Sequence, residues 1–245
     1  MMRALSILVA VGLLVEEVSG LIIPSHAART QPSGLLRAQP RMQQTIDGVR
    51  VGPPPDLPSL LMFNRILYLG AALQPSVTEL VVAELLYLNY ESPSKPVYMY
   101  INSVGTAAFE TDAFAIADTM NYVSPEIETI CLGTAFGTSA MLLANGAKGK
   151  RACLPNSSLM LSQPRGQSRG QASDIALNAR EVLRSRHTIY TMLSEKTGQP
   201  FEKIEADCSR SKYLNADQAL AYGLIDKVLK SDADLPVKPT FLTEL

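Results

Sequence analysis

Apolar and polar positions divide the chain from residue 65 onward into short apolar runs and longer segments with helical spacing. The runs at residues 65–69 (RILYL), 97–101 (VYMYI) and 127–132 (IETICL) have the length and the β-branched or aromatic content of buried strands, and residues 152–161 supply further strand. Strands that alternate with helices are typical of parallel βαβ units. The pattern therefore predicts an α/β fold.

The segments between these strands have the composition of helices. Asp174 is expected to be the N-cap of the longest helix, Gly198 ahead of Pro200 its stop, and Gly223 the end of the last helix. Residues 92–95 break the first helix. The predicted helices span residues 77–89, 109–120, 138–144, 174–197 and 216–222.

The first residues have the pattern of a targeting signal. Arg3 precedes the apolar run 4–15, which is too short for a stable membrane-spanning helix and fits a signal peptide at residues 1–20. An uncleaved membrane anchor is the weaker alternative.

Residues 21–46 carry Arg29, Arg37 and Arg41 and no Asp or Glu, which is the composition of a transit peptide. A signal peptide followed by a transit segment predicts import into the stroma of a plastid with extra membranes, a secondary plastid. Ordinary secretion followed by a disordered linker is the alternative reading.

The rest of the chain is expected to form one domain with two short flanks. Residues 47–58 contain the proline-rich run GVRVGPPPDLP, which predicts a linker or an extended arm, because proline lacks a backbone donor and restricts its neighbour. Residues 59–232 form the predicted domain, and residues 233–245 a C-terminal tail.

Charge and cysteine content exclude several classes of function. A formal net charge of -1 gives no electrostatic reason to expect nucleic acid, because binding a phosphate backbone normally needs a basic face. Cys131, Cys153 and Cys208 are odd in number and widely spaced, which favours buried free thiols over a metal site. The chain has no P-loop of the form GxxxxGK[ST], so any ATP dependence must come from a partner, and no cofactor is expected.

Nine segments, in order from about Pro58 to Leu229, resemble the proteolytic-subunit family of Clp proteases (peptidase family S14). The resemblance implies a spiral of βαβ turns, related to that of the crotonases, with a long handle helix at residues 174–197. It also implies rings of seven subunits, stacked in pairs through a handle strand at residues 164–171 around a closed chamber. The segments are RILYLG, VVAELLYL, PVYMYINS, AIADTM, TICLGTA, ANGAKGKR, LPNSSLMLSQP, GQASDIALNAREVLR and YGLIDKVL.

The same resemblance places the catalytic triad of the family on three residues that lack its chemistry. Gly137 occupies the position of the nucleophilic serine, Ser162 that of the histidine base, and Ser211 that of the aspartate. Glycine has no side chain to attack a peptide, and a serine hydroxyl cannot take up a proton near pH 7. No catalytic residue is therefore assigned.

The oxyanion region also departs from the family. The Pro-Gly-Gly turn of active members appears as Val104, Gly105 and Thr106, with about two extra residues before Ala113. Loss of one oxyanion donor costs about 10²-fold to 10³-fold in rate. These departures, with the PPDLPSLL arm, are similar to ClpR subunits, the non-catalytic members in plastids and cyanobacteria.

The number of histidines supports a non-catalytic role independently of the family resemblance. The chain contains two histidines, His26 in the predicted leader and His187 in the long helix. His187 stands between Arg186 and Thr188 and is interpreted as an exposed or packing residue. A Ser-His mechanism therefore has no plausible base.

Two other activities stay open at this stage. Ser139 with Lys148 or Lys150 would give an active endopeptidase with an unconventional site, although the GAKGKR turn offers no apolar pocket to lower a lysine pKa. Glu110 would be the base of a crotonase-fold acyl-CoA enzyme.

The leading hypothesis is a structural subunit of the ATP-dependent Clp core that contributes to protein quality control. Its implied partners are other ClpP and ClpR subunits, a hexameric AAA+ unfoldase and unfolded protein substrates, with no nucleic acid and no stable membrane insertion.

Overall fold

The computed structural model describes residues 44–46, 49–51, 57–107, 109–166 and 168–231. The chain divides into one unit that ends at Pro54 and a second that begins at Pro55. In the first unit, β1 (Gln44–Ile46) pairs antiparallel with β2 (Val49–Val51). The predicted signal peptide and C-terminal tail lie outside the described residues.

The second unit is organised around a seven-stranded sheet with a parallel centre, as the alternating pattern predicts. The spatial order is β3 (Ile66–Leu69), β4 (Val97–Ser103), β5 (Ile127–Phe136), β6 (Arg151–Cys153) and β9 (Lys227–Val228), all parallel. Beyond its pairing with β6, β5 continues and pairs in parallel with β7 (Ser158–Leu161), which pairs antiparallel with β8 (Lys212–Leu214). The chain therefore belongs to the α/β class.

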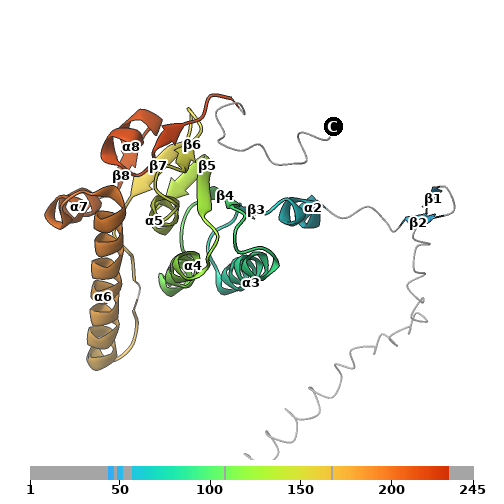
Figure 1. Cartoon of the computed structure of the whole chain (residues 1–245). Helices are drawn as coiled ribbons and strands as arrows, with labels where there is room; N and C mark the ends of the chain where they lie inside the picture. Colours follow the sequence, from blue (N-terminus) through green and yellow to red (C-terminus); the bar gives the residue numbers. More distant parts are fainter. Residues whose placement is uncertain (1–43, 47–48, 52–56, 108, 167, 232–245) are drawn as a thin grey trace, which may run out of the picture. The chain divides into compact units, whose positions relative to one another are not determined.

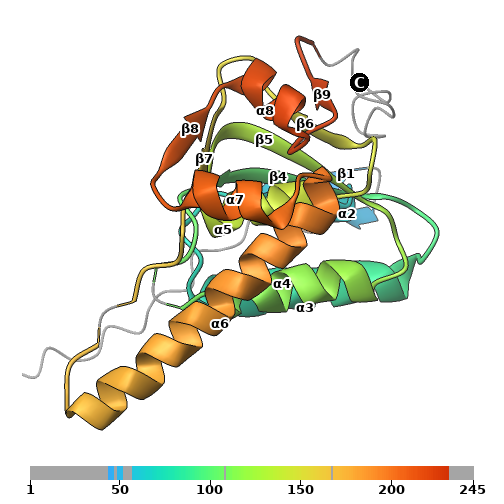
Figure 2. The same ribbon diagram turned by 90° about the vertical axis from the view of Figure 1, so that its left-hand side faces the viewer.

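Helices cover this sheet and close the core. In Figures 1 and 2, α3 (Pro75–Glu91) and α4 (Thr111–Tyr122) lie side by side along the sheet. Every residue of the short helix α5 (Thr138–Ala144) is buried. α2 (Leu57–Phe63), α7 (Phe201–Cys208) and α8 (Ala216–Tyr222) complete the unit. The apolar core contains Leu67, Met99, Ile101, Ile116 and Leu142, among others.

The longest helix, α6 (Ala172–Thr197), projects from the body as a handle (Figures 1 and 2). Its buried residues all lie at Ser185 or beyond, whereas residues 172–181 are exposed. The segment after β7 runs beside it, since a Cβ at Gly166 would lie 2.7 Å from Val182 Cγ2. Within the described part of residues 164–171 the single chain forms no strand, so the handle strand that would pair across two rings stays a prediction.

Several predicted boundaries are corrected by the structure. Asp174 is not the N-cap of α6: Gln171 is, because its extended backbone (φ -67°, ψ 154°) lets the helix begin at Ala172. Asp174 lies instead in the first turn, where its charge favours the positive helix end. The proline-rich arm ends earlier than predicted, because Pro58 fits the first turn of α2, where an N–H is not needed.

Other features agree with the prediction. The backbone is left-handed at Gly198 (φ 74°) and Gly223 (φ 89°), where α6 and α8 end. Cys131, Cys153 and Cys208 are free and buried. Among the described residues, no helix combines the length and the apolar content that a bilayer crossing requires.

We expect the substitution Gly223→Ala to destabilise the protein more than Gly149→Ala, although both glycines have a φ near +90°. A Cβ at Gly223 would lie 2.7 Å from the Thr197 carbonyl oxygen, whereas one at Gly149 meets no atom within 4 Å. The expected losses in unfolding free energy are about 2–4 kcal/mol and about 1 kcal/mol, measured by urea denaturation. Equal losses would show that α8 can shift away from α6.

Candidate functional site

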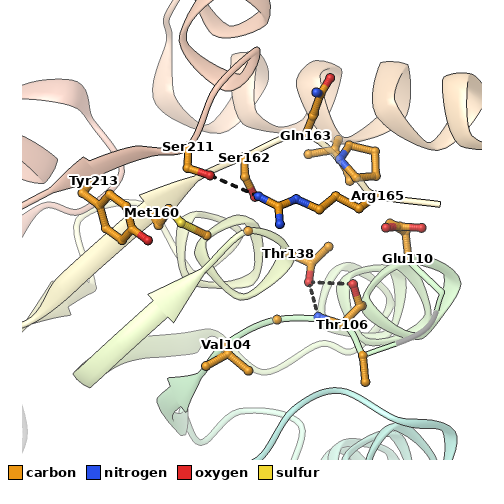
Figure 3. Close-up of a pocket in the computed structure, with 15 residues that line it drawn as sticks. Val104, Thr106, Glu110, Thr138, Met160, Ser162, Gln163, Arg165, Ser211 and Tyr213 are labelled. Carbon is orange, nitrogen blue, oxygen red and sulfur yellow. Dashed lines mark hydrogen bonds between the residues drawn. The ribbon is translucent and has the colours of Figure 1, made fainter. Parts of the chain in front are cut away.

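A cavity of about 410 Å³ opens where β5 passes into α5, and it is lined by all five residues that the resemblance assigns to the degenerate triad and the oxyanion region (Figure 3). These residues are Gly105, Thr106, Gly137, Ser162 and Ser211. They come from four separate parts of the chain: the loop after β4, the β5–α5 turn, the segment after β7 and the segment before β8. The fold therefore brings the predicted site positions together.

Gly137 lies at the sharp turn between β5 and α5. Its backbone angles (φ 55°, ψ -115°) favour glycine, and its N–H donates to the Met160 carbonyl at 2.8 Å. A Cβ built on Gly137 would lie 3.3 Å from Ser162 Oγ. A side chain at position 137 would thus face position 162, as a nucleophile faces its base, but here neither group is present.

Ser162 and Ser211 contribute hydroxyl groups to the cavity, and Arg165 contributes a positively charged guanidinium. Ser162 follows β7 and is half-buried, and Ser211 precedes β8 and is exposed. Arg165 reaches into the same space, and its Nη2 donates to Ser211 Oγ at 3.4 Å (Figure 3). Neither serine can act as a general base near pH 7.

The loop after β4 carries the two candidate oxyanion donors, and both are already used. Gly105 N–H donates to Ser103 Oγ at 3.2 Å, and Thr106 N–H donates to Thr138 Oγ1 at 2.9 Å (Figure 3). A developing oxyanion would need donors that are aimed at it and unoccupied. Here it would first have to displace two of the chain's own hydroxyls.

The position of this loop is fixed by its backbone contacts with the segment before α3. Leu73 N–H donates to the Gly105 carbonyl at 2.9 Å, and Ala107 N–H donates to the Leu73 carbonyl at 3.0 Å. Gly105 is left-handed (φ 93°), and a Cβ there would lie 2.7 Å from the Phe136 carbonyl oxygen. Gly105 therefore packs directly against the end of β5, with no room for a side chain.

The histidine expected to be structural lies away from the cavity. His187 is exposed on α6, its ring centroid is 5.2 Å from that of Phe201, and it is not among the residues that line the cavity. His26 lies outside the described residues.

Among the described residues that line the cavity, Glu110 supplies the one carboxylate, and burial raises the pKa of this group.

The alternative nucleophile Ser139 is not placed to react. Its side chain is fully buried, it does not line the cavity, and its Oγ makes no hydrogen bond in the described structure. Lys150 Nζ lies 2.9 Å from both Glu126 Oε2 and Glu128 Oε1, and these hydrogen bonds raise its pKa. Such a lysine stays protonated, and Lys148 is exposed to solvent. The geometry disfavours a Ser-Lys dyad.

Two residues of the cavity were missed in the sequence analysis. Thr138, one residue after Gly137, accepts the hydrogen bond of the Thr106 N–H. Arg165, one residue after the Gln-Pro pair, reaches into the cavity. Their positions in the sequence, close to the triad equivalents, were the signal that could have identified them.

In the described residues no group of three or more His, Cys, Asp or Glu side chains is arranged to hold a metal ion.

Comparison with known proteins gives one consistent result. The family model described as Clp protease matches residues 55–232. The chain is 47% identical to the "Putative ATP-dependent Clp protease proteolytic subunit-like" protein of Synechococcus elongatus, over 77% of this chain and 91% of that protein. It is 52% identical to "ATP-dependent Clp protease proteolytic subunit 2" of Gloeobacter violaceus, over 74% and 84%. It is 47% identical to "ATP-dependent Clp protease proteolytic subunit-related protein 4, chloroplastic" of Arabidopsis thaliana, over 74% and 61%.

Proposed function

Because this chain belongs to the Clp protease family, a family of serine peptidases, we propose that it is a non-catalytic, ClpR-type structural subunit of the ATP-dependent Clp core. The observation that carries the proposal is the cavity: position 137 is a glycine, and Ser162, toward which its side chain would point, is not a base. Gly137, Ser162 and Ser211 are then degenerate triad positions, and Gly105 and Thr106 the remains of the oxyanion region.

The outer surface of the second unit supports assembly with related subunits. α3 exposes Leu80, Leu86, Tyr87 and Tyr90, and the projecting part of α6 exposes apolar side chains including Leu177. Apolar surface of this extent is typical of protein contacts. We propose that α3 packs against neighbouring ClpP or ClpR subunits within a heptameric ring, and that α6 and residues 164–171 contact the opposite ring. The hexameric AAA+ unfoldase would then deliver unfolded substrates to the shared chamber.

We place this assembly in a plastid, where it would serve protein quality control. The support comes from the leader composition at residues 1–46, which lies largely outside the described residues, and from the chloroplastic relative in Arabidopsis. The stroma of a secondary plastid fits the order of signal peptide and transit segment. An amino-terminal sequence of the mature protein that began just after residue 20 would contradict this location.

The test is a fluorogenic-peptide assay on the chain alone and on the complex purified from its source. We expect the chain alone to show no cleavage above buffer, and the complex to contain Ser-His-Asp subunits and to cleave. Ser139→Ala in this chain should leave the activity of the complex unchanged. Cleavage by the isolated chain that Ser139→Ala abolishes would overturn the proposal.

A further inference from the structure

A positively charged side chain, that of Arg165, lines the cavity in the place where an active member of the family would carry out catalysis. Its guanidinium donates to Ser211 Oγ at 3.4 Å. Among the described residues no carboxylate forms an ion pair with Arg165. A guanidinium has five N–H donors, so several remain for a ligand in the cavity.

Hydroxyl groups line the same cavity, facing Arg165 (Figure 3). Thr106 N–H donates to Thr138 Oγ1, and the Thr138 hydroxyl in turn donates to Thr106 Oγ1 at 3.5 Å. Whichever hydroxyl of this pair donates to the other, one hydroxyl proton remains for an incoming acceptor, and Ser162 adds a further hydroxyl. Arginine combined with hydroxyl donors is the usual chemistry for binding a carboxylate or a phosphate.

The remaining walls distinguish between these ligands. Most of the exposed lining is polar, but Val104, Met160 and Tyr213 add apolar groups, which a free inorganic anion would not use. A peptide that ends in an apolar residue would use both surfaces, with its carboxylate at Arg165 and its terminal side chain against the apolar wall. A volume of about 410 Å³ suits such a short segment.

We propose that this cavity binds the C-terminal carboxylate of short apolar peptides, with Arg165 as the charged ligand-binding group. The inference rests on the proposed function, because a subunit that does not cleave peptides can retain those released by active neighbours in the same chamber. Glu110, the N-cap residue of α4, lines the cavity and places a second carboxylate near the ligand (Figure 3). It therefore weakens binding of the carboxylate.

The test measures binding of acetyl-Ala-Ala-Leu and of its C-terminal carboxamide to the full chain by ligand-observed NMR or titration calorimetry. We expect the free acid to bind about tenfold or more tightly than the amide, since one charge-assisted interaction is lost. Because Arg165 is exposed to solvent, Arg165→Ala should weaken binding of the acid by about three- to tenfold, and Glu110→Gln should strengthen it several-fold. Arg169→Ala is the matched control, because Arg169 is an exposed arginine of the same segment that does not line the cavity.

Equal binding of acid and amide, or undiminished binding by the Arg165→Ala variant, would overturn the proposal. So would competition by acetate or inorganic phosphate at the same concentration as the peptide, because the apolar wall would then contribute nothing. Mass spectrometry of the recovered peptide separates the two hypotheses. Cleaved peptide would contradict the non-catalytic role, whereas intact peptide that fails to bind would contradict only the carboxylate site.

Discussion

Restoring the three missing side chains, by Gly137→Ser, Ser162→His and Ser211→Asp together, is expected to leave the chain without efficient peptidase activity. The reason is the oxyanion region, because Thr106 N–H already donates to Thr138 Oγ1 at 2.9 Å. Loss of one oxyanion donor lowers kcat by about 10²-fold to 10³-fold even with a complete triad. The rate of fluorogenic-peptide cleavage should therefore stay at least about a hundredfold below that of an active subunit.

The further substitution Thr138→Ala should raise the rate of this restored variant by about tenfold or more, since it frees the Thr106 donor. Thr138→Ser is the matched control, because serine keeps a hydroxyl at the same place and should give no gain. Arg165→Ala is included in all three variants, so that Arg165 does not compete with the new histidine for the carboxylate at position 211. Full activity of the restored triad with Thr138 unchanged would show that the Thr138 contact does not block the site.

The location of the site was accessible from the sequence because it depends on elements with a strong local pattern. Most residues of the apolar runs 97–101 in β4 and 127–132 in β5 are buried, so these runs stand out, and both strands are followed at their carboxyl ends by the predicted site segments. Gly105 and Gly137 then lie at the same edge of the sheet because parallel strands point in one direction. All five site positions were assigned through the family resemblance, and the strand pattern supports only those of Gly105 and Gly137.

The roles of Thr138 and Arg165 in the cavity could not be predicted, because they depend on contacts between segments that are distant in the sequence. The hydrogen bond from Thr106 to Thr138 spans 32 positions, and that from Arg165 to Ser211 spans 46. The short elements α7, β8 and β9 were missed for a related reason. β8 has three residues with one buried side chain, so its pairing with β7 and not its own pattern makes it a strand.

Asp226→Asn is expected to destabilise the fold by about 3–5 kcal/mol, because it removes the charge that compensates a buried guanidinium. The Arg151 side chain is 4% exposed, and its Nε and Nη2 donate to Asp226 at 2.8 Å and 2.7 Å. The same carboxylate accepts the Gly149 N–H at 2.7 Å. Urea denaturation of the full chain at pH 7 and low salt measures the loss without screening the ion pair.

Two controls separate the ion pair from general effects of substitution. Glu181→Gln removes an exposed partner of Arg184 and should leave the urea midpoint unchanged. The double variant Arg151→Met with Asp226→Leu should recover more than half of the loss, since no buried charge then remains unpaired. A double variant as unstable as Asp226→Asn would instead show that the pair holds β6 and β9 together through its geometry.

The same ion pair predicts a loss of stability in acid. The hydrogen bond from Arg151 is the main cause that lowers the pKa of Asp226 below its usual value. A carboxyl whose pKa is lower in the folded state contributes fully above its unfolded pKa of about 4 and loses that contribution as the pH falls through the folded value. The wild-type urea midpoint should therefore fall more steeply below pH 4 than that of Asp226→Asn. Parallel curves would mean that Asp226 is no more acidic in the folded chain than in the unfolded one.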